Sequence, residues 1–156
     1  MTTNYTTHVV TSNDIPHDWD FSGVKYFSLN CFTKSSTTAF VVVEDKVSYV
    51  TRYAMTVEGE HVEYQEECKK VAGIAEIGVF YGKITMMYIS VREEFKGQGF
   101  GKVIYDMIIK FMKETHPGEI LHRTSPSAFA PNFFKKVVDK WLDDVGVPWY
   151  QEESLY

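Results

Sequence analysis

Residues 91–102 read VREEFKGQGFGK, and they join two segments with different hydrophobic periods. An apolar segment leads into them from Ile84, and apolar residues at helical spacing follow them. Alternate glycines lack a Cβ, so a tight loop can turn several N–H groups toward one point, where a helix N-terminus adds partial positive charge. A strand, a glycine loop and a helix in this order predict an anion-binding site, and a phosphate-bearing cofactor is the first hypothesis.

The bulk composition is that of one ordinary globular domain. The chain has 156 residues, of which 44% are hydrophobic and 24% charged. We therefore expect a single domain over residues 1–156, in which roughly the first 38 residues are atypical and hardest to interpret. There is neither a run of about 18 apolar residues nor a secretory signal pattern, so we expect a cytoplasmic protein with no membrane partner.

The net charge and the spacing of potential metal ligands argue against further classes of function. The net charge of −5 argues against a broad nucleic-acid interface, which normally requires a clustered positive face. Cys31 and Cys68 are far apart in the chain, and the five histidines never fall at i and i+4. We expect no nucleic-acid partner, no disulfide framework and no metal.

Most of residues 24–91 is rich in β-branched and aromatic residues, which predicts strands. Residues 38–43 and 47–55 are expected to form a first hairpin around a turn at 44–46. Residues 71–80 and 84–91 are expected to form a second hairpin around Tyr81, Gly82 and Lys83. The pattern of the charged segment 58–70 does not decide between a short helix and a loop.

The remaining elements are less regular. Residues 11–16 indicate a turn or a helix start, and residues 24–32 fit either a strand or a helix. After the glycine loop, an amphipathic helix is expected to end at Pro117 and Gly118. A strand at 119–124, a helix at 131–142 and an edge strand at 147–150 follow. Together these elements predict an α/β protein of the α+β type, with a single mixed, mostly antiparallel sheet.

The segment from Ile89 to Gly101 resembles the acyl-CoA-binding motif of the GNAT family of N-acetyltransferases. That motif has a strand ending in valine, then arginine or glutamine, then two small residues at alternate positions. Gly99 and Gly101 match the small residues, Phe95 stands where an aromatic is common, and Lys96 replaces the usual arginine or glutamine. The resemblance covers mainly residues 85–112, and the hairpin at 71–91 and the elements at 119–141 also fit the family.

Other glycine motifs fit less well. A Walker loop requires a longer spacing followed by lysine and a hydroxyl residue, and the dinucleotide fingerprint requires a later third glycine within a βαβ unit. The alternative is that the glycines only make a tight turn between strand and helix.

The resemblance implies acetyl-CoA as cosubstrate, bound by the end of the central strand and by the glycine loop. Backbone groups of the strand would hold the pantetheine arm, with the N–H of Ile89 or Val91 as oxyanion donor. The implied cosubstrate contacts are Ile89, Ser90, Val91, Lys96, Gly97, Gln98, Gly99, Phe100, Gly101 and Lys102.

A general base is also required, because only a neutral amine attacks a thioester. Glu76 lies in an apolar strand, where burial would let a carboxylate accept a proton near neutral pH. An outward-facing charge on the sheet is an equally good interpretation of Glu76. Tyr53, Tyr88 and His122 are further catalytic candidates, because each lies on an expected strand near the cleft.

The general acid is where this chain departs from the family. Many relatives carry a tyrosine that protonates the leaving thiolate, four residues after an alanine. Aligning Ala130 with that alanine places Phe134 at the tyrosine position and Ser127 where asparagine is common. Ser125, Ser127 or water would then have to serve as the acid.

These observations predict transfer of an acetyl group from acetyl-CoA to a primary amine, by direct attack in a ternary complex. The amine could belong to a small molecule or to a protein, and the chain could be a monomer or a homodimer. The alternative is a GNAT-fold module that binds CoA or a partner with little or no turnover, and a domain that holds only a generic anion is a third possibility.

Overall fold

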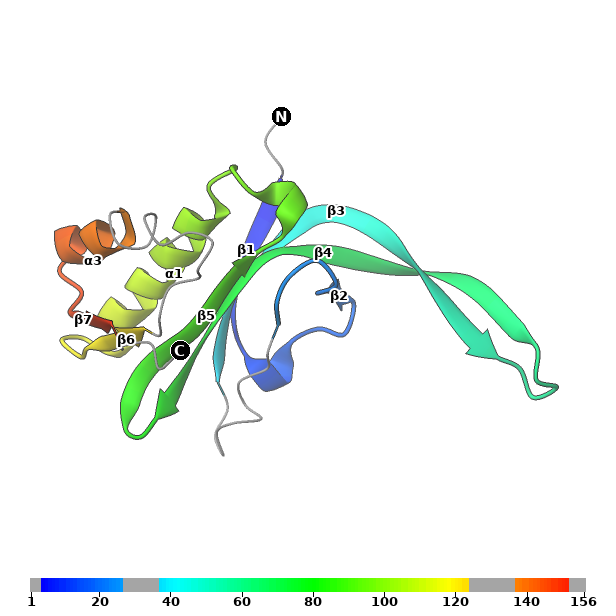
Figure 1. The fold of residues 1–156 in the computed structure, drawn as a ribbon, viewed down its shortest axis with the longest axis horizontal. Coiled ribbons are helices and arrows are strands. Elements are labelled where there is room, and N and C mark those ends of the chain that lie inside the picture. Colours follow the sequence, from blue (N-terminus) through cyan, green and yellow to red (C-terminus); the bar gives the residue numbers. More distant parts are fainter. Residues whose placement is uncertain (1–3, 27–36, 124–136, 152–156) are drawn as a thin grey trace.

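A computed structural model describes residues 4–26, 37–123 and 137–151, which form one sheet with helices on one side (Figure 1). The elements in chain order are β1 (Tyr5–Thr11), η1 (Ser12–Asp14), β2 (Trp19–Asp20), β3 (Thr38–Met55), β4 (His61–Phe80), β5 (Lys83–Val91), η3 (Glu93–Phe95), α1 (Phe100–Thr115), β6 (Leu121–Arg123), α3 (Asp139–Val145) and β7 (Trp149–Gln151).

The sheet has the strand order β1-β3-β4-β5-β6-β7, and β2 lies beside β4 off this path. The long pairings of β1 with β3, β3 with β4, and β4 with β5 are antiparallel. The pairings of β2 with β4, β5 with β6, and β6 with β7 are short and parallel. The expected mixed and mostly antiparallel sheet is confirmed.

Helix α1 covers one face of the sheet, because its apolar residues recur at helical spacing and lie on one side. Ile104 and Ile108 are fully buried in this core. Gly73 of β4 permits the close approach of the helix, since a Cβ at that position would lie 2.8 Å from Cδ1 of Ile104. On the opposite face, Val41, Val71 and Ile74 pack against the N-terminal segment.

The expected first hairpin is wrong, because residues 38–43 and 47–55 are not antiparallel partners but parts of the single strand β3. Residues 44–46 belong to β3, which continues to Met55 and pairs with β4 across irregularities between Val42 and Val47. The chain instead reverses at residues 56–60, where Gly59 has a φ of +84°. Residues 58–70 are therefore neither a helix nor a loop, because most of them form β4.

The second hairpin, the helix after the glycines and the edge strand are confirmed. β4 and β5 pair around residues 81 and 82, α1 ends at Thr115, and β7 lies at the sheet edge beside β6. The strand expected at 119–124 is the three-residue β6. Residues 131–136 of the expected last helix lie outside the described residues, and the described helix α3 begins at Asp139 and ends at Val145.

Candidate active site

The strands β5 and β6 run together over only two residues. Thr85 pairs with His122 and Met86 pairs with Arg123, and β5 then continues for five residues to Val91. In the part of the chain that the structure describes, no strand lies beside β5 on this side beyond Met86. Within the described residues, β6 therefore accompanies only the first part of β5, and backbone groups along a strand edge can bind an extended ligand.

The glycine loop has the backbone geometry of an anion site. Gly97 and Gly99 have φ values of +85° and +86°, in the left-handed region that other residues rarely adopt. Gly99 is the N-cap of α1, and the first helical hydrogen bond runs from the N–H of Val103 to the Gly99 carbonyl at 3.2 Å. The N–H groups of Phe100, Gly101 and Lys102 precede that bond, as expected at a helix N-terminus.

The space beside the loop is open, and the buried ring of Phe100 anchors the loop in the core. A Cβ added to Gly97 or Gly99 would meet no atom within 4 Å, so the space beside the loop is open. The ring of Phe100 is only 3% exposed and makes an edge contact with Phe95, with ring centroids 6.0 Å apart. Only the backbone of Phe100 can therefore contribute to a site.

The side chains of the other expected contacts have partners within the protein. The Lys96 ammonium lies 2.7 Å from Glu93, and that of Lys102 lies 2.5 Å from Asp106. Both lysines are well exposed, so a phosphate could compete for them at little cost. The Ser90 hydroxyl accepts a hydrogen bond from the Lys25 N–H at 2.9 Å.

Ile89 and Val91 have their side chains against the α1 core. Their contribution to a site would therefore be through the backbone. Gln98 is exposed within the loop.

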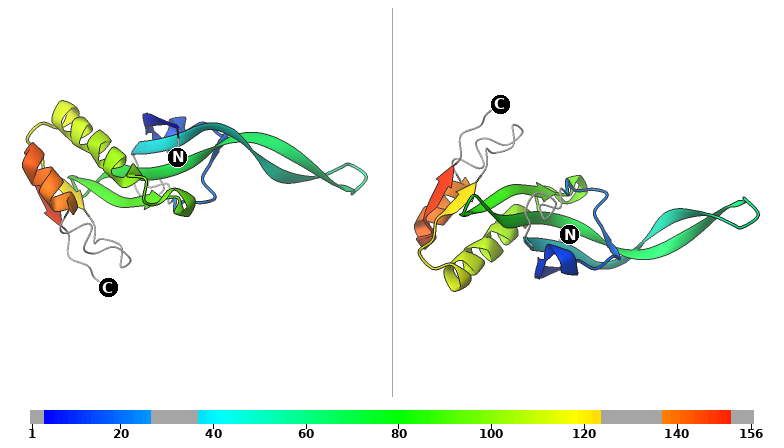
Figure 2. Two further views of the ribbon diagram at one scale, coloured as in Figure 1. Left: turned by 90° about the horizontal axis from the view of Figure 1, so that it is seen from above. Right: turned by 90° about the horizontal axis from the view of Figure 1, so that it is seen from below.

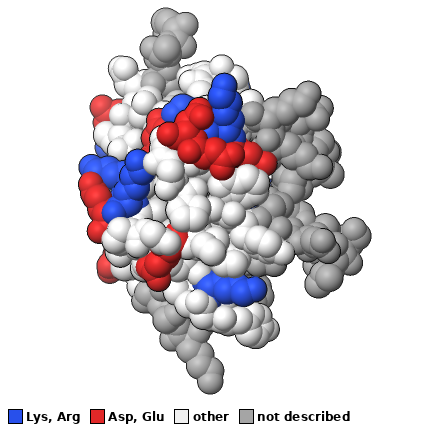
Figure 3. All heavy atoms as spheres, turned by 90° about the vertical axis from the view of Figure 1, so that its left-hand side faces the viewer, with Lys and Arg blue, Asp and Glu red and all other residues white. Residues whose placement is uncertain are grey.

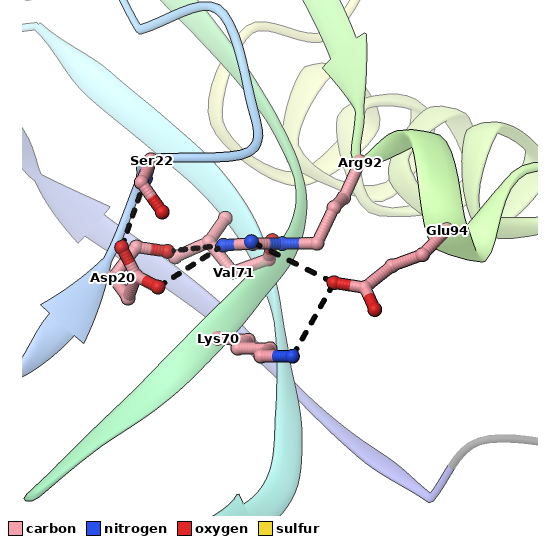
Figure 4. A network of polar contacts seen from close by, with 6 residues as sticks. All are labelled: Asp20, Ser22, Lys70, Val71, Arg92 and Glu94. Atoms are coloured by element: carbon pink, nitrogen blue, oxygen red, sulfur yellow. Dashed lines mark hydrogen bonds and ion pairs between the residues drawn. The ribbon is translucent and has the colours of Figure 1, made fainter. Parts of the chain in front are cut away.

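Arg92 joins the site to the N-terminal segment, and no motif in the sequence singles it out. Its guanidinium donates to the Val71 carbonyl at 2.8 Å and to the Asp20 carbonyl at 2.7 Å (Figure 4). Its charge is met by the carboxylates of Asp20 at 3.8 Å and Glu94 at 3.7 Å. The Arg92 side chain is only 7% exposed. Its buried contacts therefore hold in place the segment that links β5 to the glycine loop.

The pKa of the Asp20 carboxylate is lowered, in part by the same contacts. Burial acts to raise its pKa, but hydrogen bonds from Ser22 and the positive charge of Arg92 outweigh burial and hold the pKa below its ordinary value. The backbone N–H of Ser22 donates to Asp20 at 2.9 Å. Asp20 is therefore an anion in the folded protein at neutral pH.

Glu76 and Tyr88 lie together on the face of the sheet opposite α1. They are register partners on β4 and β5, and the Tyr88 hydroxyl donates to Oε1 of Glu76. Thr37 donates to the other carboxylate oxygen at 2.7 Å. Glu76 is fully buried and Tyr88 is half-buried, so the outward-facing interpretation of Glu76 is wrong.

The other catalytic candidates lie apart from this pair. His122 lies beside Thr85, three residues before Tyr88 along β5, and its ring faces Tyr150 at a centroid distance of 5.6 Å. Tyr53 lies far out on the β3–β4 hairpin opposite Glu63. The acid candidates Ser125 and Ser127, together with Ala130 and Phe134, lie outside the described residues.

No group of three His, Cys, Asp or Glu side chains in the described ranges is arranged to hold a metal ion. Among the helices of the same ranges, none combines the length and apolar character needed to cross a bilayer.

Comparison with known proteins agrees with this geometry. The model of the acetyltransferase (GNAT) family matches residues 22–138, which is more than half of the chain. The chain therefore belongs to the GNAT acetyltransferase family, whose members use acetyl-CoA for acetyl transfer. No curated protein sequence matches the chain closely enough to count as a relative.

Solved structures with a similar fold include complexes of GNAT toxins. The AtaTR complex with acetyl-CoA is 15% identical, with 85% of this chain and 82% of that chain covered and a TM-score of 0.47. A mutant AtaT toxin bound to the C-terminus of the antitoxin AtaR and acetyl-CoA is 13% identical, with coverage of 86% and 83% and a TM-score of 0.47. The KacTA–DNA complex is 13% identical, with coverage of 83% and 81% and a TM-score of 0.46.

Proposed function

We propose that the protein transfers an acetyl group from acetyl-CoA to a primary amine, by direct attack of the amine in a ternary complex. The observation that carries this proposal is the glycine loop at the start of α1, which follows the strand that carries Tyr88 of the buried carboxylate–tyrosine pair. Glu76 lies on β4 and Tyr88 on β5, and β5 leads through η3 into the glycine loop, so a single extended ligand along β5 can reach both the pair and the loop.

The glycine loop would hold the pyrophosphate of acetyl-CoA. The N–H groups of Phe100, Gly101 and Lys102 at the start of α1 provide donors and the positive end of the helix dipole. Lys96 and Lys102 add charge at the rim. Backbone groups of Ile89 and Val91 would orient the thioester, where one N–H can stabilise a developing oxyanion. When bound, the cosubstrate supplies an acyl carbon already activated by its thiol leaving group.

Tyr88 and Glu76 would take the proton that the amine loses. Tyr88 is the member of the pair that is partly exposed, whereas Glu76 is enclosed behind it. The amine proton passes to the tyrosine oxygen as the tyrosine proton passes along the existing hydrogen bond to Glu76. The relay lets Glu76 act on the amine without touching it.

Replacing Tyr88 by phenylalanine is expected to lower kcat about 10²-fold while leaving the affinity for acetyl-CoA unchanged, since general-base catalysis typically contributes 10²–10⁴-fold. Glu76→Gln should have a similar effect, because the amide cannot accept the relayed proton. The measurement is release of free CoA with a panel of alkylamines, lysine peptides and N-terminal peptides. Tyr49→Phe, on the exposed hairpin, is the matched control and should keep full activity.

The result that contradicts the assignment is full turnover in both variants. If the wild-type protein binds acetyl-CoA but neither hydrolyses it nor acetylates any amine of the panel, the protein is a binding module and not an enzyme. If calorimetry detects no saturable acetyl-CoA binding, the cosubstrate assignment itself is wrong.

A further inference from the structure

A long two-stranded hairpin projects from the sheet (Figures 1 and 2). We call it the arm, and it comprises residues 47–69. β1 accompanies β3 only as far as Glu44, and β2 contacts β4 only at Lys69 and Lys70. Among the described residues, both outer edges of the arm therefore lack a neighbouring strand beyond these points. Nine residues per strand give the arm a reach of about 27 Å.

One face of the arm carries a repeated pair of side chains. Residues directly opposite one another in an antiparallel ladder share a face, and Tyr49 lies opposite Glu67 while Tyr53 lies opposite Glu63. Tyr49 is 62% exposed and Tyr53 is 72% exposed, although tyrosine usually covers part of its ring. The two tyrosine–glutamate pairs are four residues apart along β3, which is about 14 Å. We call this surface the tyrosine face.

The arm is strongly acidic. Residues 49–67 contain five glutamates and one arginine, with no lysine or aspartate. Arg52 forms an ion pair with Glu66 at 3.1 Å on the opposite face. Glu63 and Glu67 have no ion pair among the described residues. At the helical end of the molecule, by contrast, basic and acidic side chains lie side by side (Figure 3).

We infer that the tyrosine face is a docking surface for an extended, basic segment of a partner protein, which adds as a strand to the open edge of β3. Side chains four residues apart point to the same side of an extended segment, so two cations at this spacing can lie beside Tyr49 and Tyr53. Each cation then meets an aromatic ring and, one strand further, the carboxylate of Glu67 or Glu63. Main-chain pairing with β3 supplies the rest of the contact.

The charge of the arm selects this occupant over two others. A second copy of the arm would bring two acidic ribbons together, and unpaired like charges at an interface oppose association. Nucleic acid is repelled for the same reason. The inference goes beyond the proposed acetyl transfer and stands without it, since the arm lies apart from the glycine loop and from Glu76.

The test uses the full chain and a fluorescein-labelled peptide, Thr-Arg-Val-Thr-Val-Arg-Thr, followed by fluorescence anisotropy. Glu63→Gln combined with Glu67→Gln should weaken binding at least about tenfold. The matched control, Glu58→Gln combined with Glu60→Gln, removes the same charge from the tip of the arm and should change the affinity by less than about twofold at physiological salt, where distant charges are screened.

The aromatic contribution has its own control. Tyr49→Thr combined with Tyr53→Thr should weaken binding about tenfold, whereas Tyr64→Thr, on the opposite face beside Arg52, should leave it unchanged. The midpoint of thermal unfolding should stay constant in every variant, which shows that the sheet is folded and keeps this test independent of the proposed enzymatic function.

Three results would each overturn the inference. The first is equal loss of binding in both glutamate pairs, which reduces the effect to net charge. The second is equal binding of a peptide whose two arginines are adjacent, which removes the four-residue spacing. The third is a dimer of the wild-type protein, detected by sedimentation, that binds no basic peptide and that dissociates when the two tyrosines are replaced. That result would assign the tyrosine face to a second copy of the chain.

Discussion

Replacing Gly99 by glutamate is expected to weaken acetyl-CoA binding about 10³-fold with the fold retained. Gly99 is the N-cap of α1 and has a φ of +86°. A carboxylate there faces the anion that the helix N-terminus would otherwise attract. Two like charges about 4 Å apart near a protein surface repel by about 4 kcal/mol, which corresponds to about 10³ in affinity. Isothermal titration calorimetry with acetyl-CoA measures the change directly.

Gly59→Glu is the matched control for this experiment. Gly59 has a φ of +84° and, like Gly99, has no atom within 4 Å of an added Cβ. Both substitutions should therefore cost a similar conformational strain of about 1–2 kcal/mol, visible as similar shifts in thermal unfolding. Only Gly99→Glu, at the start of α1, should lose affinity for acetyl-CoA. Equal affinity in the two variants would show that the anion site lies elsewhere.

Replacing Arg92 by methionine is expected to lower the free energy of unfolding by about 3–5 kcal/mol, because it leaves the nearly buried Asp20 carboxylate without its partner. Methionine keeps much of the side-chain volume, so the loss reports the polar contacts more than packing. Urea denaturation, followed by circular dichroism, measures the difference. Loss of acetyl-CoA affinity should accompany it, since the Arg92 side chain also ties the segment that leads into the glycine loop to the carbonyls of Val71 and Asp20.

Two controls identify the cause of this loss. Arg52→Met breaks an exposed ion pair on the arm and should cost less than about 1 kcal/mol. Adding Asp20→Asn to Arg92→Met should recover part of the loss, because it removes the unpaired charge. A double variant no more stable than Arg92→Met would show that the guanidinium acts through the carbonyls of Val71 and Asp20 alone.

The dependence on pH follows from the lowered pKa of Asp20. Because the folded pKa lies below the unfolded value, near 3.8, the carboxylate stabilises the folded state at neutral pH, and this contribution is lost as the pH falls through the folded pKa. The Arg92→Met variant lacks the partner charge. The stability difference between wild type and variant should therefore be largest above pH 4 and shrink in stronger acid.

The glycine loop and its helix could be predicted because their signals are local. Glycine spacing and the helical repeat from Phe100 lie within one short segment, and the structure confirms both. The hairpin of β4 and β5 was equally local, with its turn at Gly82. The family resemblance rested on these residues and is confirmed by the family match.

The sequence pattern does not predict the arm, for a physical reason. A strand that covers a core alternates apolar and polar residues, but both faces of residues 61–67 contact solvent, so no alternation is required. The charged residues 44–46 looked like a turn, whereas they lie where β3 irregularly shifts its register against β4. The signal that could have located the true turn is Gly59 between Glu58 and Glu60.

Contacts between residues far apart in the chain could not be predicted from the sequence. Arg92 meets Asp20 across 72 residues, and nothing near Arg92 indicates which carboxylate it will find. The pairing of Glu76 with Tyr88 follows from the hairpin register, although a bulge between Glu76 and Ile77 shifts it. The contact between Glu76 and Thr37 depends on how a distant segment enters the sheet.

The separation of the arm from the core has a consequence for how this protein can diverge. No buried side chain of the α1 core lies on residues 47–67, so we expect insertions or deletions there to leave the proposed acetyl-CoA site undisturbed. Two residues added to each strand would lengthen the ladder without turning any side chain to the other face. Homologues should therefore differ in arm length in paired steps, and the length in each species would record the dimensions of the molecule it evolved to meet.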